Sequence, residues 1–183
     1  MYLFAMKKLT IIHLIAICIL FLSLTCCSSG LEHNADVTPL PAETAAGTET
    51  AAENVTFRDK NGKDIELYKF IGDKPIILKF IDCSEQTAPD ELKLISDCYP
   101  EHSEHIHFFV VLQKLDPGDP IPETLFEESS PLYPLYYDPD GSASGKYGAD
   151  SSATFFIDRD GFISVSSLHP ITREEFNFAL KLI

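Results

Sequence analysis

Cys83 is the residue of this sequence whose position suggests chemistry. It lies in the stretch "KFIDCSEQTAPDEL", residues 79–92, where an apolar run meets a helical pattern. Unpaired backbone N–H groups and the helix dipole at a helix N-terminus favour the thiolate form of a cysteine. A thiolate held there would attack a disulfide or a peroxide.

The charges around Cys83 oppose that chemistry. Asp82, Glu85, Asp90 and Glu91 put four carboxylates between residues 82 and 91, and no Lys, Arg or His lies among them. Nearby negative charge disfavours the thiolate and raises the pKa of a thiol. The sequence therefore gives no sign that Cys83 is activated.

Cys98 is the other cysteine of the folded part, and we expect it to be unpaired. A helix over residues 87–97 would separate Cys98 from Cys83 by about 16 Å, whereas a disulfide needs Cα atoms within about 7 Å. Cys98 is thus expected to be a small buried residue near the helix end. Two unpaired thiols in an exported domain are unusual, which keeps a redox function for Cys83 open.

Other polar clusters suggest weaker alternatives. The histidines and acids of residues 101–107 have the ligand types of a zinc or copper site, but a solvated loop entering a strand explains them better, and we expect no metal and no cofactor. The tyrosines between residues 133 and 137 either line a binding face or close a loop. "DPDGS" (138–142) and "DRDG" (158–161) lack the distant Glu of a calcium loop and are predicted to be turns.

The elements that would position these residues follow from hydrophobic patterning. "KPIILKFID" and "HIHFFVVL" are apolar runs typical of buried strands, and "TAPDELKLISDCY" between them has helical spacing with Thr87 as the expected cap. "NVTFRDKNGKDIEL" predicts a hairpin around Asn61-Gly62, "ATFFIDRDGFISVSSL" predicts a second hairpin, and "ITREEFNFALKLI" an amphipathic helix capped by Thr172. The order is a hairpin, βαβ, then ββα, which predicts an α/β fold with a mixed sheet flanked by helices.

The N-terminus is typical of an exported protein. A basic start at Lys7 and Lys8 precedes an apolar run from Leu9 to Leu24, which is short for a membrane span. "LTCC" then resembles the lipobox of bacterial lipoproteins, which implies a signal peptide over 1–27 and acylation of Cys27, or alternatively of Cys26. The lipid would anchor the chain to a membrane on the extracytoplasmic side of a bacterial envelope.

Residues 28–54 separate this signal from the rest of the chain. They are rich in Ala, Thr and Glu and poor in aromatics, which predicts a flexible tether, so a single domain is expected over 55–183. The formal net charge of −14 argues against nucleic acid as a partner, since nucleic acids are bound by cationic surfaces.

Residues 55–183 resemble the TlpA-like branch of the thioredoxin superfamily. The resemblance rests on "DKNGKDIELYKFIGDKPIILKF", "YYDPDGSASGKYG" and "ATFFIDRDGFI", and it implies a thioredoxin-like fold. The two cysteines of the family's CxxC motif fall on Glu85 and Ala88, while Glu91 matches a family acid. The family's cis-proline falls on Ser152, where we expect a trans peptide bond because a cis bond before a residue other than proline costs about 3 to 4 kcal/mol.

Two functions are compatible with this pattern. One is a thiol-disulfide oxidoreductase or a peroxiredoxin-like monothiol enzyme, in which Cys83 attacks and an outside thiol partner resolves the intermediate. The other is a redox-inactive family member that binds an envelope protein as an accessory module. The missing CxxC motif and cis-proline favour the second function.

Overall fold

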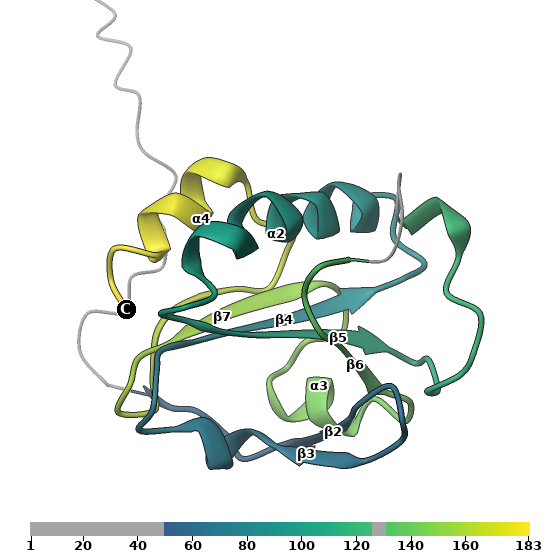
Figure 1. The fold of residues 1–183 in the computed structure, drawn as a ribbon, viewed down its shortest axis with the longest axis horizontal. Helices are drawn as coiled ribbons and strands as arrows, with labels where there is room; N and C mark the ends of the chain where they lie inside the picture. The colour runs from purple at the N-terminus through teal and green to yellow at the C-terminus, as the bar shows by residue number, and fades with distance from the viewer. Residues whose placement is uncertain (1–49, 126–130) are drawn as a thin grey trace, which may run out of the picture. The chain divides into compact units, whose positions relative to one another are not determined.

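The computed structural model describes residues 50–125 and 131–183, which form one mixed β-sheet with helices on both faces (Figure 1). The strand order is β1-β8-β7-β4-β5-β6-β2-β3. The strands are β1 (Thr50–Ala51), β2 (Thr56–Arg58), β3 (Asp64–Glu66), β4 (Ile76–Asp82), β5 (His107–Gln113), β6 (Leu135–Asp138), β7 (Ala153–Ile157) and β8 (Phe162–Ser167).

The two predicted apolar runs form the centre of this sheet. β4 pairs in parallel with β5, from Ile76↔His107 to Asp82↔Gln113, and antiparallel with β7 on its other side. Both faces of β4 are covered, because Ile77 and Ile81 belong to one apolar core and Leu78 and Phe80 to the other. This double burial explains the nearly continuous apolar run.

The helices divide between the two faces. α2 (Ala88–His102) and α4 (Arg173–Ala179) lie together on one face of the sheet, and α3 (Ser142–Lys146) lies on the other (Figure 1). Two short 3₁₀ helices, η1 (Leu67–Phe70) and η2 (Glu123–Leu125), complete the regular structure of the described residues. The predicted hairpin, βαβ and ββα order and the α/β thioredoxin-like fold class are confirmed.

The two predicted helix caps had different outcomes. The Thr172 hydroxyl accepts a hydrogen bond from the Glu175 N–H, and the Glu175 carboxylate accepts one from the Thr172 N–H, which is a complete capping box. Thr87 precedes α2 as predicted, but its backbone has helical torsion angles and its side chain caps no N–H group. A cap residue normally has extended torsion angles that aim its oxygen at the first turn, so the prediction for Thr87 was wrong.

α3 was not predicted as a helix, because residues 138–142 were interpreted only as a turn. The buried carboxylate of Asp138 accepts hydrogen bonds from the N–H groups of Ala143 and Ser144 and from the Ser144 hydroxyl. These bonds satisfy N–H groups in the first turn of α3. The short helix therefore depends on a buried acid at the end of β6.

The folded part also begins earlier than the predicted boundary at Val55. Thr50 and Ala51 pair with Ile163 and Phe162 of β8, and the Ala52 N–H donates to the Gly161 carbonyl. Residues 50–54, assigned to the tether from their composition, therefore belong to the sheet and its edge. The signal peptide, the rest of the tether, Cys26 and Cys27 lie outside the described residues.

None of the helices in the described part of the chain is long and apolar enough to cross a membrane.

Candidate functional site

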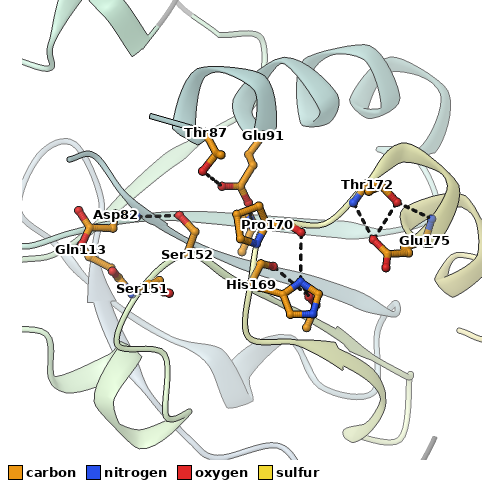
Figure 2. Close-up of polar contacts among 12 residues, drawn as sticks. Asp82, Thr87, Glu91, Gln113, Ser151, Ser152, His169, Pro170, Thr172 and Glu175 are labelled. Atoms are coloured by element: carbon orange, nitrogen blue, oxygen red, sulfur yellow. Dashed lines mark hydrogen bonds and ion pairs between the residues drawn. The ribbon is translucent and has the colours of Figure 1, made fainter. Parts of the chain in front are cut away.

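The candidate site lies where β4 ends and α2 begins. Residues 83–87 connect the two elements. The loop before β7, residues 149–152, reaches the end of β4, where Ser152 lies beside Asp82 (Figure 2). β4 and β7 are neighbours in the sheet, with Phe80 opposite Ala153. The topology therefore brings Cys83, Glu85, Ala88 and Ser152 to one end of the sheet.

Cys83 directly follows β4 and is partly buried. Its side chain packs against the apolar core between the sheet and α2, and it is close enough to Tyr137 for a negative charge on its sulfur to affect that phenol. Burial, followed by the negative charge of Asp82, raises the pKa of the Cys83 thiol to about 11. Cys83 is therefore protonated at neutral pH.

Asp82 keeps its negative charge beside this thiol. Its Oδ1 accepts hydrogen bonds from the Ser84 hydroxyl at 2.6 Å and from the Ser84 N–H at 2.9 Å. The bond from the Ser84 hydroxyl contributes most to holding the pKa of Asp82 below its ordinary value. The largely exposed Lys114 lies 3.7 Å from Oδ2, and its positive charge also helps to lower the pKa of Asp82.

The two positions that match the CxxC motif differ in exposure. Glu85 is partly exposed, and its Oε2 atom is buried without a hydrogen-bond partner. Ala88 is the first residue of α2 and has no exposed surface. The Ala88 N–H donates to the Glu85 carbonyl at 3.3 Å, so the two residues are joined by one turn of backbone. Neither side chain has a thiol, so neither can take part in thiol-disulfide exchange.

Ser152, on which the resemblance places the family's cis-proline, is fully buried. Its hydroxyl accepts a hydrogen bond from the Asp82 N–H at 3.2 Å, which links the loop before β7 to the end of β4 (Figure 2). No peptide bond among the described residues is cis, so the expected trans bond before Ser152 is confirmed. The buried Gln113 side chain also holds this loop, donating to the carbonyls of Ala149 and Ser151.

A buried ion pair joins Lys79 of β4 to Glu91 of α2, close to residues 83–87. The sequence did not predict this pair. Lys79 is on β4 between Ile77 and Ile81, and Glu91 is in the first turn of α2. The side chains are 1% and 3% exposed. Burial is the main cause that lowers the pKa of Lys79, while the charges of Glu91 and Glu85 act in the opposite direction. A single Lys inside an otherwise apolar strand was the signal available in the sequence.

The other residues that the sequence suggested as sites are Cys98, the tyrosines of residues 133–137 and the histidines and acids of residues 101–107. Cys83 and Cys98 are both free, as expected. Tyr133 is buried and its hydroxyl donates to the Leu92 carbonyl, so it holds its loop against α2, whereas Tyr136 and Tyr137 lie on β6. His107 pairs with Asp73 at 2.8 Å. Within residues 50–125 and 131–183, no cluster of three or more His, Cys, Asp or Glu side chains has metal-binding geometry.

Comparison with known proteins identifies the relatives of this fold. The model of the AhpC/TSA family matches residues 48–166, which is more than half of the chain. The chain belongs to the AhpC/TSA family. The family contains relatives of thiol-disulfide oxidoreductases and peroxiredoxins, and the TlpA-like, thioredoxin-like assignment is confirmed. No curated protein matches the sequence.

Solved structures of similar fold are redox proteins. A secreted Mycobacterium tuberculosis disulfide oxidoreductase homologous to Escherichia coli DsbE is 16% identical, with a TM-score of 0.59 over 70% of this chain and 96% of its own. The exposed lipoprotein thioredoxin Etrx1 of Streptococcus pneumoniae is 19% identical (TM-score 0.56; 72% and 100% covered). The mitochondrial 2-Cys peroxiredoxin of Plasmodium falciparum is 18% identical (0.56; 74% and 91%). At these identities the likeness shows the fold alone.

The geometry of this AhpC/TSA-family chain does not support dithiol chemistry. A CxxC site needs one exposed, low-pKa thiol and a second thiol within bonding distance. The resemblance places those positions on Glu85 and Ala88, which have no thiol, and the thiol of Cys83 is partly buried with a raised pKa. Among the described residues the site therefore lacks an activated nucleophile.

Proposed function

We propose that this protein is a redox-inactive, TlpA-like accessory module of a bacterial cell envelope that acts by binding a partner protein. The observation that carries the proposal is the state of Cys83. Its sulfur packs against apolar groups beside an ionised carboxylate, which is the environment of an unreactive thiol. The thioredoxin-like scaffold then remains as a binding surface.

The lipobox-like sequence at residues 24–27 supports an anchored, extracytoplasmic location. One protein of similar fold is described as an exposed lipoprotein and another as secreted. Acylation of Cys27 would tether the domain to the membrane. Labelled palmitate should therefore be incorporated into the wild-type protein and be lost in Cys27→Ser; loss in Cys26→Ser alone would assign the lipid to Cys26 instead.

Alkylation of Cys83 tests the absence of redox chemistry. The full-length protein is treated with iodoacetamide at a series of pH values, and labelling is read from the tryptic peptide that carries Cys83, which contains no other cysteine. We expect slow labelling with a midpoint well above the free-thiol value of about 8.5. The same protein in denaturant is the control, and its midpoint should return to that value.

A low midpoint would overturn the proposal. Fast labelling with a midpoint below about 8.5 would mean that Cys83 is an activated nucleophile. The alternative function, a thiol-disulfide oxidoreductase or peroxiredoxin-like monothiol enzyme using Cys83, would then replace the accessory role. Disulfide and peroxide substrates should be assayed in that case.

A further inference from the structure

The Lys79–Glu91 pair has only one hydrogen bond between its charged groups and little access to water. An ammonium group has three donors, but among the described residues the single acceptor for Lys79 Nζ is Glu91 Oε2. The side chains of both residues are at least 97% buried. A buried ammonium with two unused donors is costly, and burial lowers the pKa of Lys79, which favours its neutral amine form.

The groups around this pair are also suited to a condensation. The Thr87 hydroxyl donates to Glu91 Oε1 at 3.4 Å, so both oxygens of the Glu91 carboxyl group are held (Figure 2). Glu85 lies close enough for its charge to act on Lys79, and its Oε2 atom is buried with no partner. Together these residues place two carboxyl groups near one amine, and the Lys79 and Glu91 side chains have almost no contact with water.

We propose that Lys79 and Glu91 become joined by an intramolecular isopeptide bond. The Lys79 Nζ atom, as a neutral amine, attacks the Cδ atom of protonated Glu91. The Nζ–Cδ bond forms, the bond from Cδ to one carboxyl oxygen breaks, and one water molecule leaves. Glu85 accepts a proton from the attacking nitrogen and returns it to the departing hydroxyl group. No oxidant, metal or second substrate is needed.

The contact between the Lys79 amine and the Glu91 carboxyl group favours this reaction. Free amines and carboxylic acids condense slowly in water, but groups held in contact have very high effective molarities, and exclusion of water opposes the reverse hydrolysis. The bond would tie β4 to the first turn of α2 across residues 80–90, the turn that carries Glu85 and Ala88. It would fix that turn covalently in a chain whose Cys83 and Cys98 are both free.

Trypsin digestion of the denatured full-length protein tests the proposal. Trypsin cleaves after Lys69, Lys79 and Lys93 and resists the Lys74-Pro75 bond, so an unmodified chain gives peptides 70–79 and 80–93. An amidated Lys79 is not cleaved. We therefore expect one peptide, 70–93, lighter than its sequence by one water molecule. This segment contains no Asn-Gly or Asp-Gly pair that could lose water by forming a cyclic imide.

Three variants sharpen the test. Lys79→Arg retains a positive charge and the trypsin site but cannot condense, and it should give separate peptides 70–79 and 80–93. Glu85→Gln lacks the proton acceptor, and shortly after synthesis it should contain a smaller share of the joined peptide than the wild type does. Asp90→Asn changes an exposed acid of the same helix, and the share of the chain recovered as the joined peptide should equal that of the wild type.

Several results would overturn the proposal. One is recovery of peptides 70–79 and 80–93 as the main products of the wild-type protein, and another is a peptide 70–93 of full mass. The persistence of an uncleaved, lighter peptide in Lys79→Arg would place the water loss elsewhere. The wild-type digest decides the question even if a variant fails to fold, and it is independent of the alkylation of Cys83.

Discussion

Cys83 shows how a single neighbouring residue helps to decide whether a thiol can react. Its position near the start of α2 suggests activation, but its sulfur lies against the apolar core, and Asp82 is ionised beside it. Burial and negative charge both favour the neutral thiol. Burial is the larger cause of the raised pKa. The low reactivity expected of Cys83 therefore depends on how the fold buries the thiol, and to a lesser extent on the charge of Asp82.

Replacing Asp82 tests this ranking of causes. Asp82→Asn removes the negative charge but keeps an oxygen that can accept the Ser84 hydrogen bonds. We expect the pH midpoint of Cys83 alkylation to fall by a fraction of a pH unit to about one unit and to stay above the free-thiol value, because burial remains. Asp90→Asn is the matched control and should leave the midpoint unchanged. An unchanged midpoint in Asp82→Asn would assign the whole effect to burial.

The pairing of Lys79 with Glu91 is a contact between single residues that the sequence could not predict. Lys79 lies in the same stretch as Cys83 and Glu91 matches a family acid, but nothing in the sequence predicts that the two side chains pair. The pair depends on α2 packing over β4 so that two residues twelve positions apart face each other. Spacing alone does not reveal such a contact between a strand and a helix.

At the scale of elements, local signals predicted ends of helices only where the chain itself supplied the partners. Thr172 and Glu175 are three residues apart and form their capping box without help from the rest of the fold. Thr87 had the same kind of signal, but the turn formed by residues 82–88 fixes its backbone in a helical conformation. The conformation of this turn therefore overrode the capping preference of Thr87.

The capping box makes the stability of α4 depend on pH. The hydrogen bond from the Thr172 N–H is the largest cause that lowers the pKa of Glu175 below its ordinary value of 4.5. A carboxyl group with a lowered pKa in the folded state stabilises the fold above its unfolded pKa and loses this contribution as the pH falls through the folded pKa. The effect is small because Glu175 is largely exposed.

Glu175→Ala should therefore lower the free energy of unfolding by about 0.5 to 1 kcal/mol at neutral pH. The difference from the wild type should shrink as the pH falls below 4.5. Urea unfolding followed by circular dichroism between pH 3 and pH 7 measures this. Glu174→Ala, at an exposed position of the same helix turn, is the control and should have a smaller effect. Equal losses at all pH values would contradict the role of the carboxylate.

At the scale of the whole molecule, the boundary of the domain depends on contacts between distant parts of the chain. Residues 50–54 look like a tether by composition, but β1 pairs with β8 more than 110 residues later. The Tyr68 hydroxyl donates to the Ala52 carbonyl and the Tyr147 hydroxyl to the Glu53 carbonyl, both at 2.8 Å. The segment covers the edge of β8 and contributes Ala52 to the core.

Two shortened chains test this boundary. Residues 48–183 retain β1, whereas residues 55–183 lose the β1 pairing, the buried Ala52 and two tyrosine hydrogen bonds. We expect the shorter chain to be less stable by about 2 to 4 kcal/mol, at roughly 1 kcal/mol for each lost hydrogen bond. Urea unfolding midpoints of the two chains provide the measurement. Equal midpoints would mean that residues 50–54 contribute nothing to folding.

The amino-acid sequence by itself determined the order of elements and the fold class. Apolar runs such as 76–82, the Asn61-Gly62 turn and the Thr172 cap are local patterns, and each sets the conformation of its own segment through side-chain periodicity and backbone preference. It also determined that no CxxC motif is present, since no two cysteines of the sequence are three positions apart.

Only the tertiary structure decided the state of Cys83, the burial of Lys79 with Glu91, the α3 helix held by Asp138 and the pairing of Thr50 and Ala51 with β8. Each of these depends on which groups approach one another across the sheet and on how much water remains between them. Burial and electrostatic interactions act through space and not along the chain, so residue type and spacing could not specify them.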